Sequence, residues 1–187
     1  MKKVFVVGIA GATQSGKSTL TKKLESALQD MKVKTFCIDS YHKAKDELPI
    51  SKAPITKEVY IDFNQPDSFH IPQLRLDLKS EIERQEVDLI LVEGTMILYD
   101  EEIFDTLDLK LYVETKADER AVRYIESYAQ YHGHEFIKNS YLDLVRYRMD
   151  EYVEPTKWKA DMIVNGSVES PQAVEMIKTY LQAKIKT

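Results

Sequence analysis

Five short apolar runs along the chain predict the buried strands of a parallel sheet. They are VFVVGI (4–9), VKTFCI (33–38), LILV (89–92), LKLYV (109–113) and MIV (162–164). Segments with helical spacing separate most of these runs, and LTKKLESALQ is one example. Because strands and helices alternate, we expect βαβ units and an α/β fold with a parallel sheet.

One region, residues 43 to 68, has no steady periodicity and contains Pro49, Pro54 and Pro66. This pattern predicts a loop-like segment. An insertion of that length within a compact domain is usually functional or disordered. Because the region follows a candidate site residue, we interpret residues 43 to 70, approximately, as a segment that covers a substrate.

The composition is that of an ordinary globular domain, with 187 residues, 43% hydrophobic and 30% charged. We therefore expect one domain over residues 1–187. A net charge of −5 argues against a nucleic-acid partner, and the longest apolar stretch is too short to span a bilayer. The opening MKKVFVV leads directly into a functional loop, so we interpret it as the first strand and not as a cleaved leader. Cys37 is the single cysteine, which excludes an internal disulfide and predicts a small buried side chain in a cytoplasmic protein.

The stretch GIAGATQSGKSTL (8–20) carries the pattern G-x-x-x-x-G-K-[ST] between a predicted strand and a predicted helix. In that context the glycines let backbone N–H groups curl around an anion, and the helix N-terminus reinforces them. The alternative is an ordinary strand-to-helix turn with a surface lysine. We expect a nucleotide triphosphate here, bound by Gly11, Ala12, Thr13, Gln14, Ser15, Gly16, Lys17, Ser18 and Thr19.

Two acidic residues follow predicted strands at the same edge of the sheet as this loop. Asp39 follows the second strand and Glu93 follows the third, whereas Asp88 lies at the opposite end of the third strand. Ligands of such sheets bind beyond the carboxyl ends of the strands. The alternative is that Asp39 caps the next segment and that Glu93 is a solvated loop residue.

These groups suit phosphoryl transfer from ATP to a small hydroxyl. Asp39 would accept or orient the hydroxyl proton, and Lys17 would contact the β- and γ-phosphates. We expect Ser18 to bind Mg²⁺, with Glu93 acting through water and Asp39 close to the same ion. The guanine-reading N-K-x-D segment of a GTPase does not occur in the sequence.

Taken together, the segments resemble the uridine kinase family, within the group that includes phosphoribulokinase and nicotinamide riboside kinase. The resemblance spans almost the whole chain and is carried by GATQSGKST, IDSYHK, DFNQPDSF, DLILVEGTMIL, DLKLYVETKADERAVR and YVEPTKWKADMIVNG. It implies the three-layer α/β/α fold of P-loop NTPases, with a five-stranded parallel sheet and a helical lid at approximately residues 116–138. It also implies ATP with Mg²⁺ as the phosphate donor, Asp39 as the catalytic base and a small-molecule acceptor. Family members often assemble, so a homo-oligomer is open, but no sequence feature decides it.

The resemblance also assigns binding residues. His42 stands where the family has a substrate-contacting tyrosine, and Asn64 stands where it has a ribose-binding aspartate. Asp62 lies two residues earlier, on the same face of an extended segment, and either replaces that carboxylate or is a plain loop acid. Lys157 and Trp158 lie where the family approaches the adenine, although Trp158 could equally pack against the core.

The lid departs from the family pattern. Arg120 and Arg123 share one helix face and could clamp phosphates, or Arg123 could simply pair with Glu119 at the i,i+4 spacing. The family's R-G-R segment reads His132-Gly133-His134 here. A neutral histidine stabilises less transition-state charge than arginine, which predicts slow turnover or a rate that depends on pH near neutrality.

The hairpin with which family uridine kinases read the pyrimidine is expected after DFNQPDSF, but HIPQLRLDLKSEIERQE has helical spacing instead. We therefore predict an ATP-dependent small-molecule kinase for a nucleoside, another riboside or a related alcohol. Activity like that of nicotinamide riboside kinase or pantothenate kinase is an alternative. A nucleotide-binding regulatory protein with a degraded lid is another.

Overall fold

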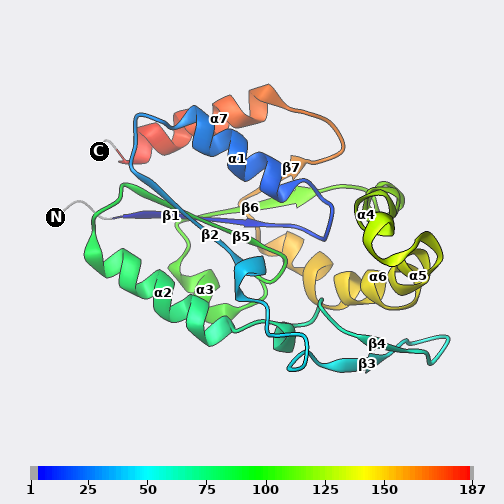
Figure 1. The fold of residues 1–187 in the computed structure, drawn as a ribbon. Helices are drawn as coiled ribbons and strands as arrows, with labels where there is room; N and C mark the ends of the chain where they lie inside the picture. The colour runs from blue at the N-terminus through cyan, green and yellow to red at the C-terminus, as the bar shows by residue number, and fades with distance from the viewer. Residues whose placement is uncertain (1–3, 186–187) are drawn as a thin grey trace.

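The five predicted strands form a single parallel sheet in the order β2, β5, β1, β6, β7 (Figure 1). The structure is a computed structural model and describes residues 4–185. The strands of this sheet are β1 (Phe5–Ala10), β2 (Val33–Cys37), β5 (Leu89–Gly94), β6 (Leu109–Glu114) and β7 (Met162–Asn165). The helices are α1 (Lys17–Ala27), α2 (Ile71–Arg84), α3 (Glu101–Thr106), α4 (Ala117–His132), α5 (His134–Ser140), α6 (Arg146–Arg148) and α7 (Pro171–Ile185). Because every predicted strand is present to within two residues at each end, the predicted fold class is confirmed.

Helices cover both faces of the sheet, with α1 and α7 on one side and α2 and α3 on the other (Figure 1). Successive side chains of a strand point to opposite faces. Val7 and Leu91 accordingly pack in the cluster beneath α1 and α7, whereas Val6 and Val92 pack in the cluster beneath α2. Burial on both faces explains why these strands read as continuous apolar runs.

The carboxyl ends of the strands meet at one edge. β1 and β2 flank β5, where Ala10 lies opposite Gly94 and Cys37 lies opposite Glu93. The segments that follow these three strands therefore start side by side. This alignment places the phosphate loop and both candidate acids at the same edge of the sheet.

Residues 43 to 68 contain regular structure that the sequence pattern did not predict. β3 (Ile50–Lys52) and β4 (Val59–Ile61) form an antiparallel hairpin, and a 3₁₀ turn (Pro66–Ser68) follows it. The loop-like interpretation was wrong here, because strands of three residues are too short to show a period of two. The hairpin lies beyond the sheet, below α5 and α6 in Figure 1.

A long helical segment continues from α5 through two wider turns. Tyr141–Val145 and Met149–Val153 are π-helical, with α6 between them, and a 3₁₀ helix (Glu154–Lys159) leads to β7. Such π turns occur frequently at functional sites. Within residues 4–185, none of the helices has both the length and the apolar character that crossing a bilayer requires.

Candidate active site

The loop between β1 and α1 has the backbone conformation of an anion cradle. Gly11 and Gly16 have φ angles of 153° and 94°, in the region where side chains are strained. A Cβ atom on Gly11 would lie 2.5 Å from the carbonyl oxygen of Val113. Because α1 begins at Lys17, directly after Gly16, the positive end of the helix dipole faces the loop.

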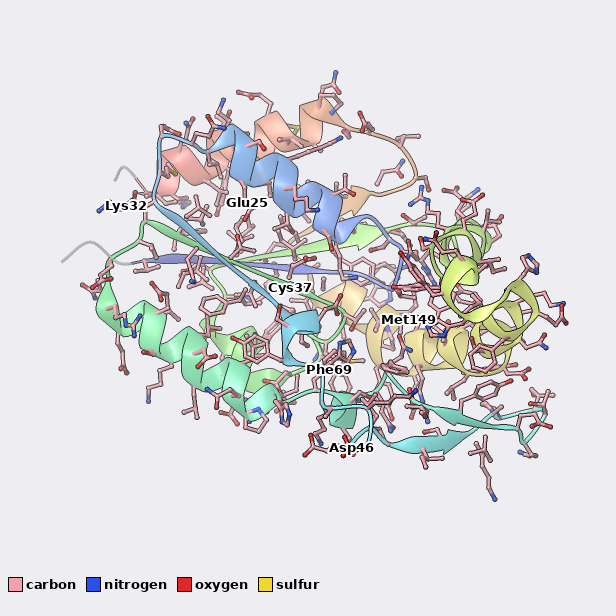
Figure 2. The ribbon with its side chains drawn as sticks, viewed as in Figure 1. Glu25, Lys32, Cys37, Asp46, Phe69 and Met149 are labelled. Atoms are coloured by element: carbon pink, nitrogen blue, oxygen red, sulfur yellow. The ribbon has the colours of Figure 1, made fainter. Side chains whose placement is uncertain are left out.

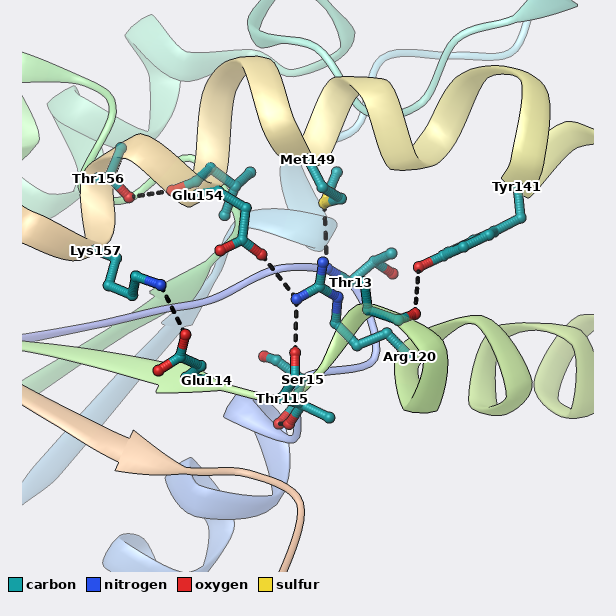
Figure 3. A network of polar contacts seen from close by, with 12 residues as sticks. Thr13, Ser15, Glu114, Thr115, Arg120, Tyr141, Met149, Glu154, Thr156 and Lys157 are labelled. Atoms are coloured by element: carbon teal, nitrogen blue, oxygen red, sulfur yellow. Dashed lines mark hydrogen bonds and ion pairs between the residues drawn. The ribbon is translucent and has the colours of Figure 1, made fainter.

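Neighbouring elements fix the curl of this loop from outside. The Thr115 hydroxyl donates to the Ser15 carbonyl at 2.8 Å, and Arg123 Nη1 donates to the Gln14 carbonyl at 3.2 Å. The Thr13 N–H donates to Met149 Sδ at 3.3 Å, as Figure 3 shows. The cradle is therefore held by the residue that follows β6, by the lid helix α4 and by the helical segment after the lid.

Four predicted catalytic or metal-binding residues converge beside the loop. The Ser18 hydroxyl donates to Glu93 Oε2 at 2.8 Å, and Glu93 is buried at the end of β5. Lys17 is only 8% exposed, and it lines a cavity together with Asp39. Asp39 lies in a 3₁₀ turn (Ile38–Tyr41) directly after β2. Ser18 and Glu93 are thus in contact, and Lys17 and Asp39 share one cavity, while their catalytic and metal-binding roles stay predictions.

Cys37 is the last residue of β2 (Figure 2) and lies opposite Glu93 of β5. Its side chain is half-buried and not fully buried as predicted, because β2 is an edge strand. Burial first, and then the negative charge of Glu93, raise the pKa of the thiol to about 11. The thiol is thus neutral at physiological pH.

A cavity of about 560 Å³ opens at this edge, between the phosphate loop, the hairpin and the lid. Its lining includes the polar residues Thr13, Lys17, Asp39, Asn64 and Thr95. Aromatic side chains form much of its wall: Tyr60, Phe63, Phe69, Tyr124, Tyr128 and Phe136. Aromatic walls with a few convergent polar groups are typical of a site for a flat, partly apolar ligand.

A second cavity of about 360 Å³ lies on the other side of the loop. Gln14, Gly16 and Thr19 line it, together with Arg123 and residues 164–170, which form the end of β7 and the loop after it. The loop thus stands between two cavities, and only the larger one is lined by Lys17 and Asp39.

The structure engages Arg120 in a buried network instead of exposing it to a ligand. Its guanidinium donates to the Thr115 carbonyl at 2.7 Å and lies 2.7 Å from Glu154 Oε1 (Figure 3). Arg120 is only 5% exposed. Burial and the nearby Glu154 carboxylate also raise the pKa of Tyr112. In this arrangement Arg120 braces α4 against the 3₁₀ helix that begins at Glu154.

Arg123, unlike Arg120, contacts the phosphate loop directly. It donates to the carbonyls of Gln14 and Gly166 and lines the smaller cavity. The alternative, an ion pair between Arg123 and Glu119 at the i,i+4 spacing, is also present, with Arg123 Nη2 3.5 Å from the Glu119 carboxylate. The two arginines therefore do not converge on one point, and the clamp stays a prediction.

The predicted acceptor-binding residues separate into two groups. His42 and Asn64 line the larger cavity, and the His42 ring packs against Phe69 at 4.3 Å. Asp62 is fully buried and its carboxylate pairs with Arg148 at 2.7 Å. Asp62 is thus a structural acid and does not replace a ligand-facing carboxylate.

Lys157 pairs with Glu114 at 2.7 Å, and neither residue lines the smaller cavity. The neighbouring Trp158 is 80% exposed, so packing against the core is excluded for its ring. The smaller cavity borders the phosphate loop, and neither Lys157 nor Trp158 lines it. Binding of the nucleotide by Lys157 stays a prediction.

Sequence reasoning missed the cavity wall. Tyr124 and Tyr128 of the lid helix both line the larger cavity, and the sequence alone assigned neither to the site. Burial and the charge of Asp39 raise the pKa of Tyr128, so this phenol lies near the candidate base. Tyr60 of the hairpin and Phe136 of α5 both line this cavity, with ring centroids 6.3 Å apart. The aromatic residues of the hairpin were visible in the sequence, but their distance from the lid along the chain concealed the contact.

The helix that we expected after DFNQPDSF, in place of the family's pyrimidine-reading hairpin, is confirmed. α2 begins at Ile71, and residues 69–88 of the described chain contain no strand. The hairpin β3–β4 precedes that segment and supplies Val59, Tyr60 and Ile61 to the cavity wall.

Comparison with known proteins matches this architecture. A family model described as the phosphoribulokinase/uridine kinase family matches residues 75–171. A uridine kinase of Lactobacillus johnsonii is 31% identical over 100% of this chain and 98% of its own length. A uridine kinase of Lactobacillus helveticus is 27% identical over 98% of this chain and 96% of its own length. Among solved structures, phosphoribulokinase from Rhodobacter spheroides has a TM-score of 0.66 at 12% identity, covering 88% of this chain and 71% of that one, which shows the shared fold. The chain therefore belongs to the phosphoribulokinase/uridine kinase family and is an ATP-dependent kinase.

Proposed function

We propose that the protein transfers the γ-phosphoryl group of ATP to a hydroxyl group of a nucleoside or another riboside. The observation that carries this proposal is the division of space by the phosphate loop. One cavity combines Lys17, Asp39 and aromatic walls, and the other lies beside the loop on its opposite side. A kinase needs both a donor site and an acceptor site in contact with one phosphate cradle.

The smaller cavity is the proposed place for the adenosine part of ATP. Its loop residues Gln14, Gly16 and Thr19 lead directly to the cradle, which would hold the phosphates together with Lys17. Arg123 lines the same cavity and is the better placed of the two lid arginines to approach phosphate oxygens.

The larger cavity is the proposed acceptor site. An aromatic base would stack among the tyrosine and phenylalanine rings, while ribose hydroxyls would reach Asp39 and Asn64. His42 lines the same wall and is proposed to contact the acceptor. Residues 43–70 and the lid, approximately 116–138, would cover this site.

The proposed reaction is an in-line displacement. Asp39 accepts the proton of the acceptor hydroxyl, whose oxygen attacks the γ-phosphorus. A new O–P bond forms as the bond from the γ-phosphorus to the bridging oxygen breaks, and ADP leaves. Lys17 offsets the negative charge on the transferring group.

The residues present fit a magnesium site. Ser18 and Glu93 already converge at 2.8 Å, and the described residues hold no group of three or more metal-binding side chains. Mg²⁺ typically takes few protein ligands beside water and phosphate oxygens, so a hydroxyl and one or two carboxylates suffice. Ser18 would bind the ion directly, Glu93 would hold it through water, and Asp39 would lie close to the same ion. When bound, the ion would neutralise charge on the phosphates.

We also propose that the protein works in the cytoplasm on small molecules. The single, half-buried and neutral thiol of Cys37 suits a reducing compartment.

The test is a panel of acceptors with ATP and Mg²⁺, followed by ADP release. Uridine and cytidine come first because the relatives reported above are named uridine kinases. Nicotinamide riboside and pantothenate follow, because the chain runs from Ser68 into α2 without a second hairpin. We expect at least one riboside to stimulate ADP release and Asp39→Asn to abolish it. If ATP binds but no acceptor raises ADP above background, the proposal is wrong.

A further inference from the structure

Asp62 is a fully buried carboxylate that lines neither of the two cavities. It directly follows β4, and its Oδ2 atom lies 2.7 Å from Nε of Arg148, on the helical segment after the lid. A buried carboxylate is costly unless it is paired and hydrogen-bonded, so this contact is required once Asp62 is buried.

The same guanidinium reaches both strands of the hairpin. Arg148 Nη2 donates to the Ser51 hydroxyl of β3 at 3.0 Å, while Nη1 donates to Glu151 at 2.7 Å on the outer side. A planar guanidinium can hold several partners in one rigid geometry, which lysine cannot do. Arg148 therefore fixes the base of the hairpin to the helix.

The second oxygen of Asp62 is bonded to a residue of the proposed acceptor site. Oδ1 accepts the backbone N–H of Asn64 at 2.9 Å, and Asn64 lines the larger cavity with Lys17 and Asp39. The backbone of Asp62 is fixed as well, because its carbonyl accepts the Ser68 hydroxyl at 2.7 Å. A continuous chain of bonds thus runs from Arg148 through Asp62 to Asn64.

We propose that Asp62 and Arg148 are positioning residues that hold Asn64 in place to bind a hydroxyl of the acceptor. The proposal rests on the proposed function, since it takes the larger cavity as the acceptor site. A buried ion pair contributes little net stability compared with apolar residues of the same size. The proposed contribution of the pair is geometric, because it fixes the backbone of a polar residue that lines the cavity.

The first measurement needs no acceptor. Amide hydrogen exchange at Asn64 reports the bond to Asp62 directly. We expect Arg148→Gln to accelerate this exchange by about 10-fold or more, because the unpaired carboxylate turns toward solvent. Arg146→Gln is the matched control, since Arg146 is exposed on the same helical segment and its guanidinium contacts the hydroxyl and the ring of the neighbouring Tyr147.

The second measurement uses uridine, or the riboside that wild-type protein phosphorylates fastest. We expect Arg148→Gln to raise the KM for the acceptor by about 10-fold while the KM for ATP stays within about twofold. If Arg148→Gln folds poorly, the double variant D62N/R148Q removes the lone buried charge and keeps an oxygen toward Asn64. That double variant should fold again, and amide exchange at Asn64 should return to the slow rate of the wild type.

Unchanged exchange at Asn64 in folded Arg148→Gln overturns the proposal. So does a rise in both KM values together, or a loss of activity that only follows a lower melting temperature. If the wild-type protein phosphorylates no riboside, the proposed function fails, and the exchange measurement still decides whether the pair positions Asn64.

Discussion

Arg120 offers the sharpest test of what the lid arginines do. The sequence predicts a phosphate clamp, whereas the structure shows a buried brace between α4 and Glu154. The two roles predict different results for Arg120→Met, which keeps much of the side-chain volume but removes the charge. If Arg120 is a structural brace, the substitution lowers the melting temperature. If Arg120 clamps phosphates, the substitution lowers turnover.

The expected loss of stability follows from burial. The Arg120 side chain is 6% exposed and that of Glu154 is 26% exposed, so breaking the pair leaves a carboxylate with limited access to water. Breaking a buried pair costs about 3–5 kcal/mol, and the partial exposure of Glu154 places this case near 3. For a chain of this size each kcal/mol lowers Tm by about 2–4 °C, so we expect a fall of about 6–12 °C.

Thermal unfolding monitored by circular dichroism measures this fall, with turnover assayed well below the transition. The double variant R120M/E154Q should recover roughly half of the loss, because it leaves no buried charge. A Tm within about 2 °C of wild type, combined with a loss of turnover of about 10³-fold, would refute the brace and establish the clamp.

The remaining predictions concern the loop and the edge of the sheet. Asp39→Asn should lower turnover by about 10²-fold or more with nearly unchanged ATP affinity by calorimetry, and an equal loss of ATP binding would assign Asp39 to the nucleotide. Glu93→Gln should raise the Mg²⁺ concentration needed for half-maximal rate, and an unchanged Mg²⁺ titration would contradict its metal role. Because burial and Glu93 raise the pKa of Cys37 to about 11, labelling by a thiol reagent should be slow at pH 8 and accelerate toward pH 11. Labelling should be faster at pH 8 in Glu93→Gln, and rapid labelling of the wild type at that pH would show that the thiol is accessible and ionised.

The sequence could predict the elements that obey a local rule. Apolar runs located the five strands, and the carboxyl-end rule placed Glu93 beside Ser18. It could not predict contacts between distant segments. Arg148 meets Asp62 across 86 residues, and short strands gave no signal for the hairpin that carries Ser51. The burial of Arg120 was equally hidden, because a helical pattern shows spacing but not which partner covers each face.

The helical segment after the lid connects all the parts of the site, and its π turns explain how. Asp143 accepts the Tyr60 hydroxyl of the hairpin at 2.8 Å, and Arg148, five positions later, binds the same hairpin. Met149 accepts the Thr13 N–H of the phosphate loop, and Glu154, again five positions later, pairs with Arg120 (Figure 3).

In a regular α-helix, positions five apart diverge by about 140° around the axis. In a π-helical turn, hydrogen bonds join positions five apart, so such residues come close to one face. The two wide turns, at 141–145 and 149–153, thus let one side of the segment hold the hairpin and another hold the loop and the lid. Since both walls of the acceptor cavity depend on this one segment, a change in its helical phase would move the hairpin and the phosphate loop together.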